Sequence, residues 1–217
     1  MDFADARYRM VQHQIRTNRV TDPLVVAAMS ELPRELFVPD ALKGIAYFDE
    51  DVPLGRGRFL IEPLATALLL QAAAIGENDV VLDVGCGPGY ASAIAARMAS
   101  AVLALESDAG LAANATRTLS DLGLETVTVA NGPLRAGWPQ QAPYDVVVFG
   151  GAIAEVPAAI LDQLAEGGRV VAVIGGDRDV GRGTLMLRKG GTVSRRPLFD
   201  ASIPMLPEFA PLPTFRF

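Results

Sequence analysis

The chain has 217 residues, half of them hydrophobic and a fifth charged, which is typical of a folded globular protein and excludes a disordered one. Its 19 basic and 25 acidic side chains give a net charge of −6, and because an acidic surface repels phosphate backbones, we expect no nucleic-acid partner. Cys86 is the only cysteine, which excludes an intramolecular disulfide, argues against a metal site and suits the reducing cytoplasm.

The sequence also argues against a membrane location. The most apolar stretch, residues 63–75, is interrupted by Thr66 and Gln71 and is shorter than the roughly 20 residues that a span needs. Residues 1–9 contain two Asp and two Arg and no apolar run, so we expect no secretory signal. We therefore expect a soluble cytoplasmic protein with no membrane partner.

The first segment, residues 1–62, has helical spacing followed by loop chemistry. Thr21-Asp22-Pro23 predicts a helix start, because an Asp side chain can cap the helix and proline fits its first turn. Pro33 ends that pattern. Residues 44–59 are rich in glycine and acids, which predicts an irregular loop.

The second segment, residues 63–174, alternates strands and helices. Apolar runs predict strands at 80–84, 101–105, 126–129, 145–149 and 169–174. The helices between and around them are expected at 63–74, closed by Gly76, from the glycine turn to Met98, from Asp108 to Gly123, and from Pro157 to Gly167-Gly168. Uniformly apolar strands alternating with helices predict a parallel sheet covered on both faces.

The third segment, residues 175–217, loses the helical period. Residues 184–187 and 191–193 predict an antiparallel strand pair, and Arg178 and Arg182 are expected in an exposed glycine-rich loop. The Pro-rich end, which finishes Phe215-Arg216-Phe217, is expected to pack over the sheet edge. We expect residues 1–217 to form one domain from these three segments.

A glycine-rich turn follows the strand at 80–84. It reads Gly85-Cys86-Gly87-Pro88-Gly89, and glycines at this spacing let a ligand approach the main chain closely. The dinucleotide-binding pattern would need another glycine where Tyr90 stands. Asp83 precedes the turn, and an acid there disfavours a pyrophosphate but suits a cofactor with an ammonium and a sulfonium group.

Polar residues end the next two strands. Glu106 follows the second strand, where a carboxylate can accept both hydroxyls of a ribose. Asn131-Gly132 follows the third, where a polar side chain can reach an adenine amino group. This succession of acid, glycine turn, acid and polar residue is typical of S-adenosylmethionine sites.

With these motifs, the chain resembles the protein-L-isoaspartate O-methyltransferase family, which has the class I methyltransferase fold. The Pro-Arg-x-x-Phe-Val-Pro segment is the most telling part, because other methyltransferases share only the glycine turn. The resemblance runs from about Met10 to Ile174 and includes Met10-Val11, residues 22–29, Pro33-Arg34-x-x-Phe37-Val38-Pro39, Ala46-Tyr47-x-Asp49, residues 81–90, Ala142-Pro143-Tyr144-Asp145, Val156-Pro157 and Gln163-Leu164-x-x-Gly167-Gly168.

The resemblance implies an α/β Rossmann-like fold, S-adenosylmethionine as cofactor, and methylation of an isoaspartyl carboxylate on damaged proteins. The family's Gly-Asp-Gly at the adenine position is Ala130-Asn131-Gly132 here, so adenine binding is expected to be retuned. The expected cofactor site comprises Asp83, Gly85, Cys86, Gly87, Gly89, Tyr90, Glu106, Asn131 and Gly132.

The expected substrate loop departs from the family. Where the family has Thr-Ile-Ser-x-Pro, this chain has Phe59-Leu60-Ile61-Glu62-Pro63, so Ile61 stands at the position of the active-site serine. Arg56 and Arg58 precede this motif, and an arginine fork matches a carboxylate. They either compensate for the lost serine or are solvated loop charges. The expected substrate site comprises Arg56, Arg58, Leu60, Ile61 and Glu62.

Three functions remain open at this point. The first is isoaspartyl methyl-ester formation, and the second is methylation of a different, more apolar small acceptor. The third is a non-catalytic protein that binds S-adenosylmethionine. His13, the only histidine, is expected on the surface of an N-terminal helix, because no acid–nucleophile pair accompanies it.

Overall fold

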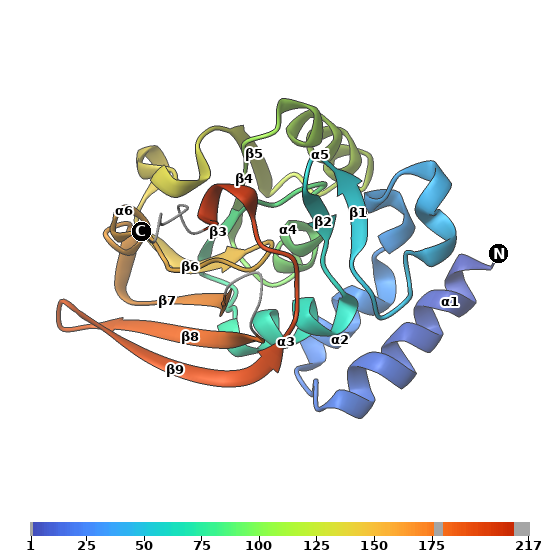
Figure 1. The fold of residues 1–217 in the computed structure, drawn as a ribbon, viewed down its shortest axis with the longest axis horizontal. Helices are drawn as coiled ribbons and strands as arrows, with labels where there is room; N and C mark the ends of the chain where they lie inside the picture. The colour runs from blue at the N-terminus through green and yellow to red at the C-terminus, as the bar shows by residue number, and fades with distance from the viewer. Residues whose placement is uncertain (1, 176–179, 211–217) are drawn as a thin grey trace, which may run out of the picture.

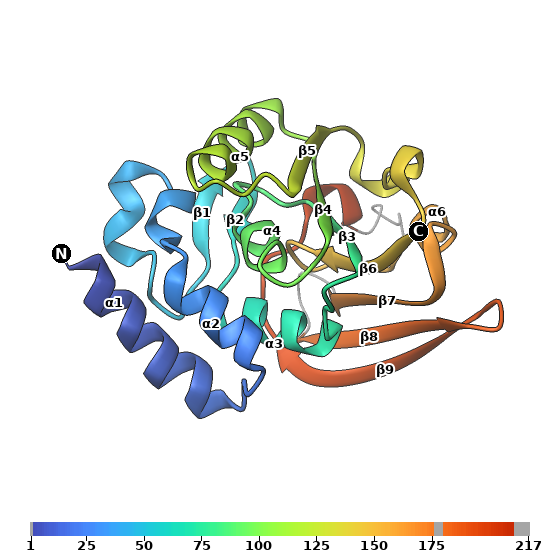
Figure 2. The same ribbon diagram turned by 180° about the vertical axis from the view of Figure 1, so that it is seen from behind.

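A seven-stranded sheet of order β5-β4-β3-β6-β7-β8-β9 organises the chain (Figures 1 and 2). The computed structural model describes residues 2–175 and 180–210. Strands β3 to β7 run parallel, whereas β8 is antiparallel to both of its neighbours. The predicted parallel sheet with an antiparallel C-terminal pair is therefore confirmed. The strands are β3 (Val80–Val84), β4 (Ala101–Glu106), β5 (Val127–Asn131), β6 (Tyr144–Phe149), β7 (Leu164–Ile174), β8 (Gly181–Lys189) and β9 (Thr192–Ala201).

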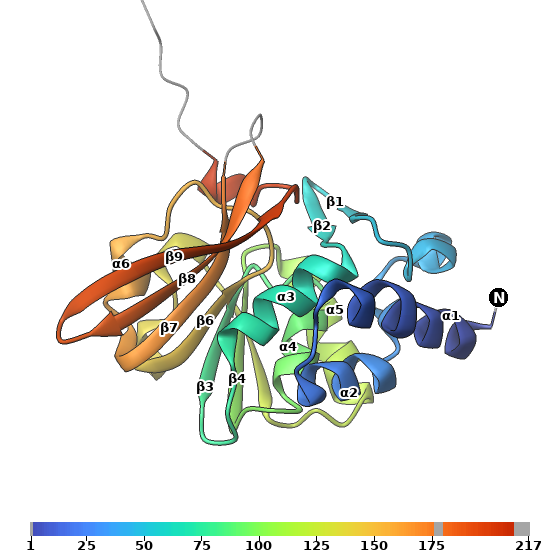
Figure 3. The same cartoon turned by 90° about the horizontal axis from the view of Figure 1, so that it is seen from below.

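Helices lie on both faces of the sheet, as Figure 3 shows. They are α1 (Phe3–Met10), α2 (Pro23–Glu31), α3 (Pro63–Ala73), α4 (Tyr90–Ala95), α5 (Ala109–Asp121) and α6 (Ala158–Leu161). Because successive strand residues point to opposite faces, Val81 packs into the core under the larger helices and Leu82 into a second core. The second core is covered by α6 and by short turns such as Pro207–Phe209.

The order of the strands creates a crevice at their carboxyl ends. From β3 the chain proceeds to β4 and β5 on one side, whereas β6 and β7 lie on the other side. Two parallel units that diverge from a central strand leave a gap beyond its carboxyl end, which is where open α/β sheets bind ligands. The glycine-rich turn after β3 lies at this point.

Two segments that are distant in sequence cover these carboxyl ends. One is a hairpin of β1 (Val52–Gly55) and β2 (Arg58–Leu60). The other is the C-terminal strap, residues 202–210, which lies beside the hairpin in Figures 1 and 3. In the strap, Leu206 N–H donates to the Ala152 carbonyl at 2.9 Å, and the rings of Phe209 and Phe149 lie 5.4 Å apart.

The strap corrects the expectation that the C-terminal residues pack over the sheet edge, because residues 202–210 cross the carboxyl ends of the strands instead. The expectations for Phe215-Arg216-Phe217 and for Arg178 fall outside the described residues. Arg182 lies on β8, where it is exposed and pairs with Asp200 at 2.9 Å.

The hairpin corrects the predicted irregular loop at 44–59. Three consecutive residues, Gly55, Arg56 and Gly57, have φ of 90°, 52° and 74°. This left-handed run reverses the chain within a tight turn and lets β1 and β2 pair. The predicted helix to Gly167-Gly168 is also too long, because β7 already begins at Leu164. A Cβ on Gly168 would lie 3.0 Å from the Tyr144 carbonyl oxygen, so this glycine permits close strand pairing.

Within residues 2–175 and 180–210, no helix has the length and apolar character that crossing a membrane requires. Over the same residues, no three side chains of His, Cys, Asp or Glu gather as a metal site.

Candidate functional site

The glycine turn wraps around the end of β4. Gly85 and Cys86 donate their backbone N–H groups to the Leu105 carbonyl at 2.8 and 3.1 Å. Gly85, Gly87 and Gly89 have φ of 75°, 57° and 94°, a region that disfavours side chains. A Cβ on Gly89 would also lie 2.9 Å from a methyl of Leu119. The spacing of the glycines is therefore required by the backbone of the turn and by its contact with α5.

Asp83 lies at the base of this turn, on β3. Its side chain is buried, and its Oδ2 accepts a hydrogen bond from Ser92 Oγ on α4 at 2.6 Å. Its Oδ1 is also buried and has no hydrogen-bond partner among the described residues. Burial raises the pKa of Asp83 to about 6, because an apolar environment disfavours the charged form. A buried carboxylate oxygen without a partner is suited to a cationic ligand group.

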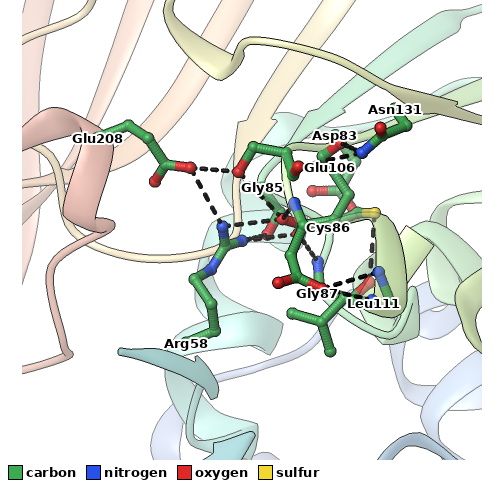
Figure 4. A network of polar contacts seen from close by, with 12 residues as sticks. Arg58, Asp83, Gly85, Cys86, Gly87, Glu106, Leu111, Asn131 and Glu208 are labelled. Carbon is green, nitrogen blue, oxygen red and sulfur yellow. Dashed lines mark hydrogen bonds and ion pairs between the residues drawn. The ribbon is translucent and has the colours of Figure 1, made fainter. Parts of the chain in front are cut away.

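Glu106 ends β4 and is fully buried. One carboxylate oxygen accepts the Asp108 N–H at 2.9 Å, and the other accepts the Gly87 N–H at 2.8 Å. Groups of the chain itself therefore already bind the carboxylate oxygens that were expected to bind a ribose. Arg58 donates to both oxygens, with Nη1 at 3.0 Å and Nη2 at 2.8 Å (Figure 4).

The two loop arginines have different environments. Arg58, on β2, is only 5 % exposed and also donates to the Gly85 carbonyl at 3.0 Å. The alternative that both arginines are solvated is therefore wrong for Arg58. Arg56 lies in the hairpin turn, where it is exposed and pairs with Asp108 at 2.6 Å. Within the chain, both guanidinium groups face acidic residues around the end of β4.

Asn131 is the last residue of β5, and Gly132 follows it at the same end of the sheet. Asn131 is exposed, and its Nδ2 donates to the Glu106 and Ser107 carbonyls at 2.8 and 3.1 Å. A Cβ on Gly132 would lie 3.0 Å from the Trp138 ring. Asn131 therefore links the ends of β4 and β5, and its adenine-binding role stays a prediction.

A small apolar cavity of about 20 Å³ borders the glycine turn at Cys86. Burial raises the pKa of the Cys86 thiol well above its usual value, so Cys86 is a neutral wall residue and not a nucleophile. The residues that line the cavity are Phe59, Leu60, Ile61, Thr66, Leu69, Leu70, Cys86, Tyr90, Ala91, Val148, Phe149 and Gly150.

Arg34 supports the backbone of the altered loop and was not predicted as a site residue. It is fully buried, and its guanidinium donates to the Ala46 and Ile61 carbonyls, each at 2.7 Å. The guanidinium carbon lies 4.8 Å from the centre of the Tyr90 ring. Its membership of the Pro-Arg-x-x-Phe-Val-Pro segment is the signal by which Arg34 could have been found.

Glu62 follows Ile61 and stands at the N-cap position of α3, where its side chain makes no capping hydrogen bond. Its backbone N–H donates to Asp51 Oδ1 at 2.8 Å. Burial, together with the charges of Asp51 and Asp49, raises the pKa of Glu62 to about 7.

The expected substrate residues therefore lie in four different environments. Leu60 and Ile61 line the cavity, and Arg58 is in the buried ion pair with Glu106. Arg56 is in an exposed ion pair, and Glu62 lies beside two other acids. Outside all of these, His13 is exposed on the π-helical segment Val11–Ile15 that continues α1, as expected for a surface position of an N-terminal helix.

Comparison with known proteins identifies the family. The model of the family described as "Protein-L-isoaspartate(D-aspartate) O-methyltransferase (PCMT)" matches residues 6–195. The chain belongs to this family. The protein-L-isoaspartate O-methyltransferase of Methylorubrum extorquens is 43% identical over 174 residues, which cover 80% of this chain and 76% of the relative. That of Methanoculleus marisnigri is 35% identical over 204 residues, which cover 94% and 92%.

Solved structures of the family share the fold. One protein-L-isoaspartate O-methyltransferase superposes with a TM-score of 0.80 at 23% identity, covering 94% of this chain and 67% of the other. A putative family member from Plasmodium falciparum, solved in complex with S-adenosyl-L-homocysteine, has a TM-score of 0.78 at 19% identity and covers 95% and 98%. The predicted family and fold class are confirmed.

The residues at the crevice fit the family's cofactor. Asp83 provides a buried carboxylate oxygen that has no partner among the described residues, and Glu106 provides a second acid on the neighbouring strand. The turn between them has no side chain on Gly85, Gly87 or Gly89. These two side chains are acidic, so the site suits a cationic nucleoside and disfavours a pyrophosphate. Glu106 can accept hydrogen bonds from a ribose only if its bonds to Arg58 break first.

Proposed function

We propose that this chain is an S-adenosylmethionine-dependent methyltransferase that methylates isoaspartyl carboxylates of damaged proteins in the cytoplasm. The observation on which this depends is the pair of buried carboxylates, Asp83 and Glu106, at neighbouring strand ends around the glycine turn. The family match over residues 6–195 supports the reaction class. The S-adenosyl-L-homocysteine complex of the Plasmodium falciparum protein supports the cofactor.

The chain's own residues bind and orient the reactants. The cofactor supplies an electrophilic methyl group on a sulfonium. Asp83 binds the positively charged ammonium and sulfonium groups of the cofactor. Glu106 accepts hydrogen bonds from the hydroxyls of its ribose. The glycine turn lets the cofactor approach the backbone closely. An acceptor carboxylate is already ionised near pH 7, so the site needs no general base. Alignment of the acceptor oxygen and exclusion of water by the apolar cavity wall are the remaining tasks.

One observation favours a second candidate function. Phe59 and Ile61 both line the apolar cavity, where the family's threonine and serine would offer hydroxyl groups. These two side chains offer no hydrogen bond to an isoaspartyl carboxylate and make this side of the site more apolar. The second candidate is therefore methylation of a different acceptor by the same cofactor site.

Transfer of a labelled methyl group to an isoaspartyl peptide tests the first candidate. We expect methyl-ester formation on the isoaspartyl peptide and none on the matched aspartyl peptide. Ile61→Ser should raise turnover about tenfold, because a hydrogen bond to a charged group contributes about 1.5–3 kcal/mol. Thr66→Val, on the same cavity wall, serves as the control for a general change in polarity.

The other outcomes separate the remaining functions. Cofactor binding without methylation of the isoaspartyl peptide, by wild type and Ile61→Ser alike, contradicts the first candidate and supports a different acceptor. An intact-mass screen of cellular products incubated with the enzyme and the cofactor would then find that acceptor. Failure of S-adenosylhomocysteine to bind in a calorimetric titration contradicts both enzymatic candidates.

A further inference from the structure

The buried ion pair occupies a position that the proposed cofactor needs. Arg58 contacts both oxygens of Glu106, and its Nη2 lies 3.0 Å from the Gly85 carbonyl. A Cβ on Gly85 would lie 3.0 Å from the same Nη2. The guanidinium therefore fills the space in front of the carboxylate at which the ribose hydroxyls would bind.

Displacement of Arg58 raises a problem of charge. Ribose hydroxyls are neutral, so a ribose on Glu106 leaves the guanidinium without its anionic partner. Arg58 is only 5 % exposed, and a buried guanidinium that loses its partner is strongly unfavourable. The displaced arginine therefore needs another anion within reach of its side chain.

Glu208, on the C-terminal strap, is placed to be that anion. Its Oε1 lies 3.8 Å from Arg58 Nη1 and also accepts a hydrogen bond from Ser107 Oγ (Figure 4). Its Oε2 is buried and has no hydrogen-bond partner among the described residues. Glu208 is thus a second carboxylate beside Arg58, and its Oε2 can accept a hydrogen bond from the guanidinium.

The strap holds Glu208 firmly at this position. The Glu208 carbonyl accepts from Arg135 Nη1 at 3.2 Å, and the Arg135 guanidinium lies 5.6 Å from the centre of the Phe209 ring. Pro207 meets the hairpin turn, since a Cβ on Gly57 would lie 3.2 Å from Pro207 Cγ. Glu208 is therefore fixed against the hairpin that contains Arg58.

We propose that Arg58 is an affinity-determining residue with two positions: it binds Glu106 in the free enzyme and moves to Glu208 when the cofactor's ribose takes Glu106. The proposal rests on the proposed function, because it assumes a nucleoside cofactor at Glu106. Arg58 competes with the ribose for Glu106. Glu208 lowers the free-energy cost of breaking the Arg58–Glu106 pair, because it forms a new ion pair with the displaced guanidinium.

Two substitutions on the same ion-pair network then have opposite effects on cofactor affinity. Arg58→Gln removes the guanidinium that competes with the ribose for Glu106. It should tighten S-adenosylhomocysteine binding about tenfold or more, because the Glu106–Arg58 ion pair no longer has to break before the ligand binds. Glu208→Gln removes the second anion and should weaken binding about tenfold. Glutamine keeps the shape of Glu208 and its contact with Ser107.

The experiment is a calorimetric titration of S-adenosylhomocysteine into the full chain and its variants. The variants are Arg58→Gln, Glu208→Gln and the double variant, with Arg9→Gln as a charge-matched control on the exposed Arg9–Asp5 pair of α1. In the double variant, Glu208→Gln should have no further effect, because the arginine that it served is absent. Arg9→Gln should leave the affinity unchanged.

Unchanged or weaker binding by Arg58→Gln overturns the proposal, and so does a loss from Glu208→Gln that persists in the double variant. In both cases wild type still binds, so the proposed function stands. Absence of binding by every variant overturns the proposed function and this inference together. If Arg58→Gln loses its far-ultraviolet circular dichroism, Arg58→Lys replaces it, and its single ammonium should tighten binding by a smaller factor; unchanged or weaker binding overturns the proposal.

Discussion

The chemistry of Asp83 depends on its burial. Its pKa is raised to about 6, first because burial disfavours the charged carboxylate, and in part because of the nearby charge of Glu106. Binding of a cationic ligand requires the ionised form. The affinity for S-adenosylhomocysteine should therefore be nearly constant above about pH 7 and should fall at lower pH as Asp83 becomes protonated.

The expected change is about tenfold weaker binding at pH 5 than at pH 7, because one proton must be released for each ligand bound. Asp83→Asn should bind more weakly at pH 7 and should lose this dependence. Calorimetric titrations at pH 5, 6 and 7 measure both effects. Glu62→Gln is a suitable control, because it removes another carboxyl with a raised pKa and should keep the dependence. If the affinity of Asp83→Asn still fell between pH 7 and pH 5, this would contradict the proposed binding of the ligand's cationic group by Asp83.

The sequence predicts the positions of Asp83 and Glu106 at neighbouring strand ends, because these positions follow from local pattern. Each lies on an apolar strand next to a break in the pattern, and parallel neighbours end at the same edge of a sheet. The pairing of Arg58 with Glu106 could not be predicted in this way. The two residues are separated by 48 positions, and their contact depends on how the hairpin folds over the sheet.

Among the elements, helix α3 has an unexpected end. The sequence predicts closure by Gly76, but the helix stops at Ala73, and Ala74 takes the left-handed conformation at φ 47° and ψ 54°. Arg169 Nη2 donates to the Ala74 carbonyl at 2.7 Å and also pairs with Asp79 at 2.6 Å. Contacts from β7 therefore decide where α3 ends, against the local preference of alanine.

This helix end allows a substitution that should stabilise the protein. A left-handed alanine is disfavoured by about 1 kcal/mol, and glycine relieves that strain. Ala74 is exposed, so Ala74→Gly should raise the free energy of unfolding by about 0.5–1 kcal/mol. Ala72→Gly, inside the same helix, should lower it by about 1 kcal/mol. Urea unfolding measures both, and a loss of stability in Ala74→Gly would contradict the assigned conformation.

The other elements show which patterns predict structure. Strand β3 has its predicted bounds, because an apolar run between two turn signals is a local property. The β1–β2 hairpin was missed, since Gly55-Arg56-Gly57 is equally compatible with an open loop in the sequence. The helix after Pro157 was predicted too long, because Gly168 serves the close pairing of β7 with β6 and not a helix end.

On the scale of the whole molecule, the site is assembled from all three segments of the chain. The glycine turn and the two acids belong to the central segment, Arg58 to the N-terminal one and Glu208 to the C-terminal strap (Figure 4). Composition and strand patterning predict the sheet, and the glycine turn predicts which end of it binds a ligand. The closure of that end depends on long-range packing of the hairpin and the strap, which no local pattern encodes.

The most direct test of the account is a crystal structure of the full chain with S-adenosylhomocysteine. The account predicts the ribose hydroxyls on the Glu106 carboxylate, the ligand's ammonium near Asp83, and Arg58 turned away from Glu106. A ligand bound elsewhere on the chain, or a ligand at the glycine turn that makes no contact with either acid, would contradict it.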